Sequence, residues 1–252
     1  MADVGTVPIS YFTDPFCPWS WGAEPSWRRL LRDFGDQVAI TYVISGLDGG
    51  QPDARVWLDA AAESRMPVDP RGVMSEPPAS TNAAGIAVKA VAEQADPGPF
   101  LRRLREAIFT ERRRADRGDA LLDVARETAP ALDIETLRIA FASHGPLEAL
   151  GADFERAAGR PRPALEVDGA VVDGRAPYGE WRGALIAAGA EPRAPALDVE
   201  AALRRFGSCA TVEVAAVCDL PGPRAAAELW RLALDWRVRA RPVLFGELWA
   251  LA

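Results

Sequence analysis

The sequence has few of the side chains that hold metals or form disulfides. Among its 252 residues there are one histidine, His144, one lysine, Lys89, and three cysteines. With one histidine and scattered cysteines, no zinc site of ordinary ligand spacing is expected. An odd number of cysteines also argues against a disulfide framework.

Long apolar runs are absent as well. None approaches the length that crosses a bilayer, so no membrane partner is expected. The first six residues lack the basic and apolar regions of a signal peptide, which together with the unpaired cysteines predicts a cytoplasmic protein. The net charge of −7 gives no bulk attraction to nucleic acid, and none is expected as a partner.

A single thiol, Cys17, stands between a predicted strand and a predicted helix. The β-type run 7–13 ends at Asp14-Pro15, and a helical pattern then extends to about residue 34. The free N–H groups at the start of a helix favour an anion, so this position lowers the pKa of a thiol. Pro18 suits the first turn of a helix. The sequence therefore predicts an exposed, activated sulfur; the alternative is a buried cysteine that happens to begin a helix.

The residues around Cys17 resemble the active site of the DsbA-like branch of the thioredoxin superfamily. The FrnE-like and Spx-adaptor-like members carry Tyr-Phe-x-Asp-Pro-x-Cys-x-x-Cys-Trp before their first helix. Ser20 takes the place of the second cysteine here, which makes the site a CxxS, monothiol version. The matching residues are Tyr11, Phe12, Asp14, Pro15, Cys17 and Trp21.

The resemblance implies an α/β thioredoxin fold with an inserted helical subdomain. The run 7–13, the helix after it and the run 38–44 form a βαβ unit, which predicts parallel strands. Strands return near 162–167 and 170–172, joined by an Asp-Gly turn, before a last helix at 178–188. The predicted helices between the two halves are 55–65, about 80–94, 96–113, 120–128, 134–142 and 147–158. The predicted domains are 1–50 with 159–190 (thioredoxin-like), 51–158 (inserted helices) and 196–252 (C-terminal unit).

Members of the superfamily carry a cis-proline just before the third strand, beside the reactive sulfur. Pro163 matches that position, and Pro161 is the fallback. The residue before the proline exposes its backbone to substrate in the family, and here it is Arg162. The alternative is an ordinary edge-strand proline in trans.

The C-terminal unit follows a predicted linker at 191–195. Three helices are predicted at 199–206, 211–218 and 224–235, then a β-hairpin at 237–249. This order resembles a small winged-helix unit. Its acidic and basic residues are nearly equal in number, whereas a DNA-binding domain has an excess of basic residues. A packing or protein-contact role is therefore favoured.

A lone thiol limits the chemistry. Cys17 is the predicted nucleophile, Ser20 its stabiliser through a hydrogen bond, and Pro163 the residue that positions substrate backbone; Phe16, Pro18, Trp19 and Arg162 are the predicted substrate-binding residues. The mixed disulfide must be resolved by glutathione or another low-molecular-weight thiol as co-substrate, by the substrate, or by Cys209 or Cys218. No tightly bound cofactor is expected. The predicted function is a thiol–disulfide oxidoreductase or isomerase acting on a protein or small-molecule thiol or disulfide.

Two other functions fit the same pattern. One is a non-catalytic adaptor that binds a protein partner, as in the Spx-adaptor-like relatives. The other is a small-molecule isomerase or transferase that uses a thiol cofactor, as in 2-hydroxychromene-2-carboxylate isomerases. Asp14 either raises the pKa of Cys17 or only ends the strand, and Trp19 either stacks on substrate or packs. His144 is expected to cap the C-terminal end of a helix, and a homodimer is left open.

Overall fold

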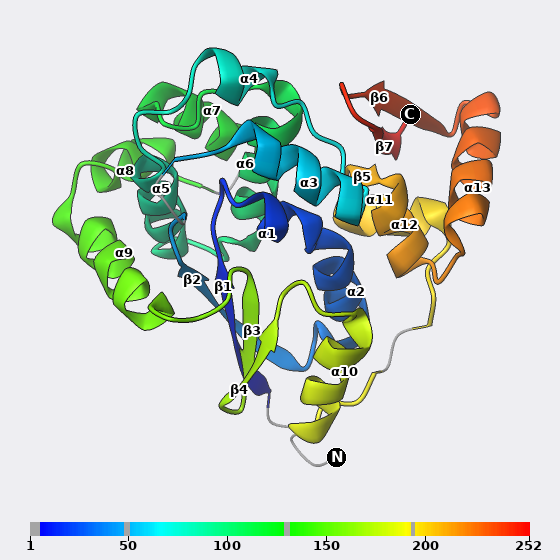
Figure 1. Cartoon of the computed structure of the whole chain (residues 1–252), viewed down its shortest axis with the longest axis horizontal. Helices are drawn as coiled ribbons and strands as arrows, with labels where there is room; N and C mark the ends of the chain where they lie inside the picture. Colours follow the sequence, from blue (N-terminus) through cyan, green and yellow to red (C-terminus); the bar gives the residue numbers. More distant parts are fainter. Residues whose placement is uncertain (1–5, 48–50, 129–131, 193–194) are drawn as a thin grey trace.

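The computed structural model describes residues 6–47, 51–128, 132–192 and 195–252. A four-stranded sheet runs through its centre in the order β2-β1-β3-β4 (Figure 1). A helical layer lies to one side, and the C-terminal unit lies on the other. The predicted linker 191–195 includes residues 193 and 194, which lie outside the described residues, as do residues 1–5 and 48–50. The proposed domain bounds stay a prediction.

The sheet has the strand directions predicted for a thioredoxin fold. β1 (Val7–Thr13) pairs in parallel with β2 (Val38–Ile44), as expected for a βαβ unit. β3 (Ala164–Val167) runs antiparallel to β1, and β4 (Ala170–Asp173) runs antiparallel to β3. Because β1 is central, most of its side chains are buried, and the strand delivers Cys17 at the edge of the core.

The helix predicted from Cys17 to about residue 34 is divided in two. α1 (Pro18–Gly22) and α2 (Glu24–Phe34) meet at Ala23. Pro25 has no N–H to give to the carbonyl four residues earlier, which interrupts the ladder of hydrogen bonds. α2 then packs on the sheet through Trp27, whose ring stacks on Tyr11 with centroids 4.3 Å apart.

The inserted region is helical, as predicted. Asp133 caps α8 through its carboxylate, which accepts from the backbone N–H of Glu135 and Thr136. α4 is an addition to the predicted set, and α9 is longer at its N-terminus, because Gly145-Pro146 forms its first turn. His144 is therefore the first residue of α9, and the prediction that it caps a C-terminus was wrong. The helices are α3 (Ala54–Ser64), α4 (Arg71–Ser75), α5 (Asn82–Ala92), α6 (Gly98–Glu111), α7 (Gly118–Thr128), α8 (Ile134–Ala140) and α9 (His144–Ala157).

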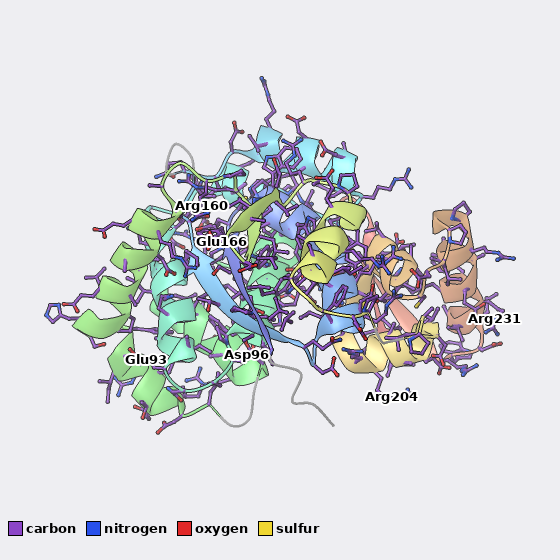
Figure 2. The ribbon with its side chains drawn as sticks, turned by 90° about the horizontal axis from the view of Figure 1, so that it is seen from below. Glu93, Asp96, Arg160, Glu166, Arg204 and Arg231 are labelled. Atoms are coloured by element: carbon purple, nitrogen blue, oxygen red, sulfur yellow. The ribbon has the colours of Figure 1, made fainter. Side chains whose placement is uncertain are left out.

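Charge pairs fix the inserted helices to the sheet. Lys89 of α5 bonds Asp153 of α9 at 2.8 Å, and Asp153 also accepts from the backbone N–H of Ile44 in β2. Arg160, just after α9, pairs with Glu166 of β3 at 2.6 Å, and Figure 2 shows these two side chains close together. The Arg160–Glu166 pair connects the two ends of the segment between α9 and β3, which contains Pro163.

The C-terminal unit has its own apolar core. After α10 (Tyr178–Ala187), which covers the sheet, come three helices and a three-stranded sheet in the order β5-β7-β6. The helices and the hairpin lie where they were predicted; the likeness to a winged helix stays a prediction. The elements are α11 (Val199–Phe206), β5 (Cys209–Ala210), α12 (Thr211–Val217), α13 (Gly222–Leu234), β6 (Val238–Pro242) and β7 (Glu247–Leu251).

A buried cluster of charges joins this unit to the rest of the chain. The Glu24 carboxylate of α2 bonds Arg105 at 2.6 Å and Arg102 at 3.3 Å, both on α6. Arg102 also bonds Glu213 of α12 at 2.8 Å, and Arg28 of α2 reaches the same carboxylate at 3.0 Å. We call Glu24, Arg28, Arg102, Arg105 and Glu213 the buried charge cluster. None of the helices in the described ranges is long and apolar enough to span a bilayer.

Replacing one carboxylate of this cluster should destabilise the fold strongly. Glu213→Gln leaves Arg28, Arg102 and Arg105 with the Glu24 carboxylate as the one anion of the cluster. We expect the free energy of unfolding to fall by about 3–5 kcal/mol, because an unpaired buried charge remains. Guanidinium-chloride unfolding measures the change.

The matched control is Glu228→Gln, at an exposed carboxylate that pairs with Arg231 one helical turn away on α13. It should cost no more than about 1 kcal/mol. Equal effects of the two substitutions would contradict a structural role for the cluster.

Candidate active site

Cys17 lies where the sequence placed it, at the start of a helix. It is the N-cap of α1, and its sulfur accepts a hydrogen bond from the backbone N–H of Ser20 at 3.4 Å. The Ser20 hydroxyl is buried and has no partner in good hydrogen-bonding geometry among the described residues. It nevertheless lies close enough to the sulfur to lower the pKa of the thiol. The CxxS motif thus brings one backbone donor to the thiol, and a hydroxyl that lies near the sulfur.

The prediction of an exposed sulfur with a lowered pKa was wrong. Cys17 is only 5% exposed, and burial raises the pKa of its thiol above the ordinary value. The backbone hydrogen bond from Ser20 and the nearby hydroxyl of the same residue oppose this rise, and the negative charge of Asp14 adds to it. α1 has only five residues, so the electrostatic help of its N-terminus is small beside the cost of taking a thiolate out of water.

Asp14 has both of the roles that the sequence left open. Its carboxylate ends the strand by accepting from the backbone N–H of Phe16 at 2.8 Å, and it lies near enough to Cys17 to raise the pKa of the thiol. Burial raises the pKa of Asp14 itself to about 6, although the hydrogen bond from Phe16 and the charges of Arg105 and Arg162 act against the rise. The site therefore contains a carboxyl group that titrates near neutrality.

The peptide bond between Arg162 and Pro163 is cis, as the resemblance implied, and Pro161 is not the cis residue. Arg162 lines the same cleft as Cys17, a hollow of about 360 Å³ between the strand-to-helix turn and α3. Phe16, Pro18 and Trp19 line it too. The structure thus brings the predicted site residues to one place, while their roles in binding or chemistry stay predictions.

Sequence reasoning missed Trp57. This residue of α3 is buried, lines the cleft, and stacks at a tilt on Phe109 with centroids 4.4 Å apart. Its indole Nε1 is buried and has no hydrogen-bond partner among the described residues. The helical pattern of 55–65 placed the residue on a helix but gave no signal that the helix lines the cleft of the thiol.

Trp19 is held by packing. The guanidinium of Arg175 lies 3.8 Å from the centre of its ring, a cation–π contact, and Arg175 also pairs with Glu63 of α3 at 2.9 Å. Trp19 remains part of the cleft wall. Trp19 therefore packs, as one of the two alternatives predicted, and its stacking on a substrate stays a prediction.

The other two cysteines are remote from this cleft. Cys209 and Cys218 belong to the apolar core of the C-terminal unit, and neither lines the cleft around Cys17. Burial raises the pKa of Cys209 to about 11 and that of Cys218 to about 12. Inert structural thiols fit these positions better than a resolving pair. Within the described ranges no three His, Cys, Asp or Glu side chains gather as metal ligands.

The strand order, the strand-to-helix cysteine and the cis-proline together define a DsbA-like protein of the thioredoxin superfamily. A family model described as thioredoxin matches residues 11–159, more than half of the chain. The chain belongs to the thioredoxin family.

Known proteins of two kinds are similar to it. The ClpXP adapter protein SpxH of Halalkalibacterium halodurans is 26% identical over 96% of this chain and 87% of its own length. Among solved structures, the cytosolic disulfide reductase DsbM of Pseudomonas aeruginosa, determined with GSH, has a TM-score of 0.57 at 21% identity, over 72% of this chain and 98% of its own. A 2-hydroxychromene-2-carboxylate isomerase has a TM-score of 0.53 at 16% identity, over 71% of this chain and 95% of its own. These two structures share the fold.

The buried carboxyl of Asp14 should make stability depend on pH. Its pKa rises from 3.8 to about 6 on folding, so ionisation is harder in the folded state. Above pH 6 the carboxylate costs the fold about 3 kcal/mol, and this cost disappears as the pH falls toward 3.8. Asp14→Asn keeps an acceptor for Phe16 and removes the charge, so it should stabilise the protein at pH 8 and have little effect near pH 4.

Urea unfolding across this pH range measures the difference. The matched control is Asp59→Asn, at an exposed aspartate of α3, which should have no such pH dependence. A gain in stability that is the same at all pH values would contradict the assigned pKa.

The thiol of Cys17 should react slowly. Because only the thiolate attacks iodoacetamide and burial raises the pKa of this thiol, we expect alkylation at pH 8 at least about ten-fold slower in the folded protein than in the unfolded chain. Peptide mapping by mass spectrometry separates Cys17 from Cys209 and Cys218. A fast reaction whose pH dependence gives a pKa below the free-cysteine value of about 8.5 would contradict this prediction and support the hypothesis of an activated thiolate.

Proposed function

We propose that this chain is a protein-binding adaptor with a thioredoxin fold, and that its thiol site is not used for redox turnover. The observation that carries the proposal is the state of Cys17. Its sulfur is buried, burial raises the pKa of the thiol, and Ser20 occupies the position of the second cysteine. A thiol that is neither ionised nor accompanied by a resolving partner is poorly suited to disulfide exchange.

The similarity to SpxH supports the same proposal. It extends over 96% of this chain and so includes the C-terminal unit beyond the thioredoxin model. Because those relatives are described as ClpXP adapter proteins, we infer a ClpXP protease as the partner and the cytoplasm as the location. The full-length similarity supports a role that needs the whole chain.

The surface of the C-terminal unit also suits a protein partner. Trp230 is 55% exposed, Leu234 80% and Trp236 87%. Trp230 and Leu234 lie one turn apart on α13, and Trp236 lies two residues after the end of the helix. Large apolar side chains that gather on a surface are typical of contact sites with other proteins. The charges of this unit are balanced, which favours a protein over DNA.

A complementation experiment tests the adaptor proposal. In a strain that lacks the gene, we expect one or more ClpXP substrates to persist several-fold longer after translation is stopped, as measured by quantitative mass spectrometry. The wild-type gene and Cys17→Ser should restore the short half-lives equally. The proposal would be overturned if Cys17→Ser, present at the normal protein level, did not restore the short half-lives. It would also be overturned if the strain that lacks the gene showed unchanged half-lives of ClpXP substrates.

Monothiol chemistry is the second candidate. The observation in its favour is that Cys17 shares a cleft with Arg162, beside the cis-proline 163. In this reaction the Cys17 thiolate attacks a disulfide and releases one thiol, and glutathione or another small thiol then attacks the mixed disulfide to restore Cys17. Ser20 would stabilise the thiolate and Pro163 would position the substrate backbone. A thiol-dependent small-molecule isomerase would use the same cleft.

A further inference from the structure

An apolar groove lies between α3 and the tip of the C-terminal hairpin. It has a volume of about 380 Å³ and shares no residue with the cleft of Cys17. Leu58 and Phe245 line it and are 38% and 49% exposed, whereas Met66, which is also part of its wall, is buried. The other wall residues are Ala61, Ala62, Arg65 and Gly246. We call this hollow the α3–hairpin groove.

Contacts between segments that are distant in the sequence build the groove. Val68 and Phe245 exchange two backbone hydrogen bonds of 3.1 Å, which fix the hairpin tip to the chain that follows α3. Gly246 has a φ of 91°, and a Cβ atom there would lie 3.2 Å from the Cβ of Pro67, so glycine permits the close approach. Walls that are in place before a partner arrives lose little freedom when it binds.

The groove has one charged residue in its wall. Of the described residues that line it, Arg65 is the one that carries a charge. Arg71 and Arg112 both pair with Asp69. Arg65, in contrast, is exposed and has no ion-pair partner among the described residues. Its guanidinium is therefore available to a carboxylate from outside the chain.

The start of α13 adds to the positive charge at this place. The Nη1 atom of Arg65 lies beside Gly222, the first residue of α13. No side chain caps this helix, so its first turn presents free N–H groups and the positive end of the helix dipole. The two carboxylates of α3, on Asp59 and Glu63, do not line the groove, and Glu63 pairs with Arg175. An acidic group on a partner is thus favoured at this end of the groove.

We propose that the α3–hairpin groove binds a short segment of a partner protein in which a large apolar side chain stands next to an acidic one. The apolar side chain packs against Leu58 and Phe245, and the carboxylate pairs with Arg65. This inference rests on the adaptor function, because an adaptor holds two proteins at once. Arg65 lies at the first turn of α13, whereas Trp230 and Leu234 lie between about 12 and 18 Å further along the same helix. The two surfaces therefore suit two different partners.

The half-lives of ClpXP substrates test the groove in the cell. Leu58→Asp places a charge in its apolar wall, and Arg65→Glu reverses the charge at its end. In the strain that lacks the gene, each variant should leave these half-lives about three-fold or more longer than the wild-type gene does. The matched controls are Leu147→Asp, on the exposed surface of α9, and Arg182→Glu, at an exposed arginine of α10 that has no ion pair within the described ranges. Both controls should restore the short half-lives.

The outcomes separate this inference from the adaptor function. If the wild-type gene and both groove variants all restore the short half-lives, the groove is not a binding surface and this inference alone is overturned. If the wild-type gene restores nothing, the adaptor function fails, and the peptide measurement below decides whether the groove binds. Circular dichroism shows whether each variant folds; Arg65→Glu, at an exposed position, decides if Leu58→Asp does not fold.

Fluorescence anisotropy with a labelled peptide tests the groove without the protease. The peptide has about eight residues and carries phenylalanines flanked by glutamates; in its neutral counterpart glutamines replace the glutamates. At low salt the full chain should bind the acidic peptide about three-fold or more tightly than the neutral one, because an exposed ion pair contributes up to about 1 kcal/mol. This preference should shrink in about 0.5 M salt, which screens exposed charges, and Arg65→Glu should abolish it.

Three results would contradict the groove as a site for an acidic, apolar segment. They are equal affinities for the two peptides at low salt, an unchanged preference in Arg65→Glu, and no binding of either peptide at millimolar concentration. Light scattering covers a different occupant. Self-association of the wild-type chain that Leu58→Asp abolishes would assign the groove to a second copy of this chain and overturn the inference.

Discussion

The structure depends on one carboxylate, Glu24, and on the guanidinium groups that surround it. Glu24 is the first residue of α2, separated from Cys17 by the short helix α1, and it bonds Arg102 and Arg105 of the inserted helix α6. Arg102 in turn reaches Glu213 in the C-terminal unit. One continuous set of buried charges therefore connects the three regions of the chain that the sequence separates. Such a set is stable only while every member keeps a partner, so the C-terminal unit is part of the same packed structure.

The state of Cys17 follows from a contest between two electrostatic effects. The start of a helix stabilises an anion by up to about 1 kcal/mol in ordinary cases, whereas full burial moves a pKa by several units in the opposite direction. In this chain the burial of the sulfur decides the outcome, and the carboxyl of Asp14 acts in the same sense. The motif marks the position of the sulfur, and the surrounding helices set its reactivity.

Local patterns predicted most of the secondary structure, because they depend on neighbours in sequence. Strands 7–13 and 38–44 and the helix 199–206 have the predicted bounds. The cis bond before Pro163 came from family resemblance, since propensity alone favours trans. The burial of Cys17, the place of Trp57 in the wall of its cleft and the buried charge cluster depend on contacts between distant segments. A sequence with many arginines and glutamates shows which charged residues exist, but it does not show which of them are buried together in the folded protein.

The tip of the C-terminal hairpin has a mechanical consequence. Val68, between α3 and α4, exchanges two backbone hydrogen bonds with Phe245, one in each direction and both of 3.1 Å. The unit is thereby attached to the inserted region at its outer end as well as to α2 at its base. Two separate anchors prevent rotation about either one alone. The C-terminal unit can therefore swing away only by giving up both attachments together, so it acts as a brace that stiffens the whole chain.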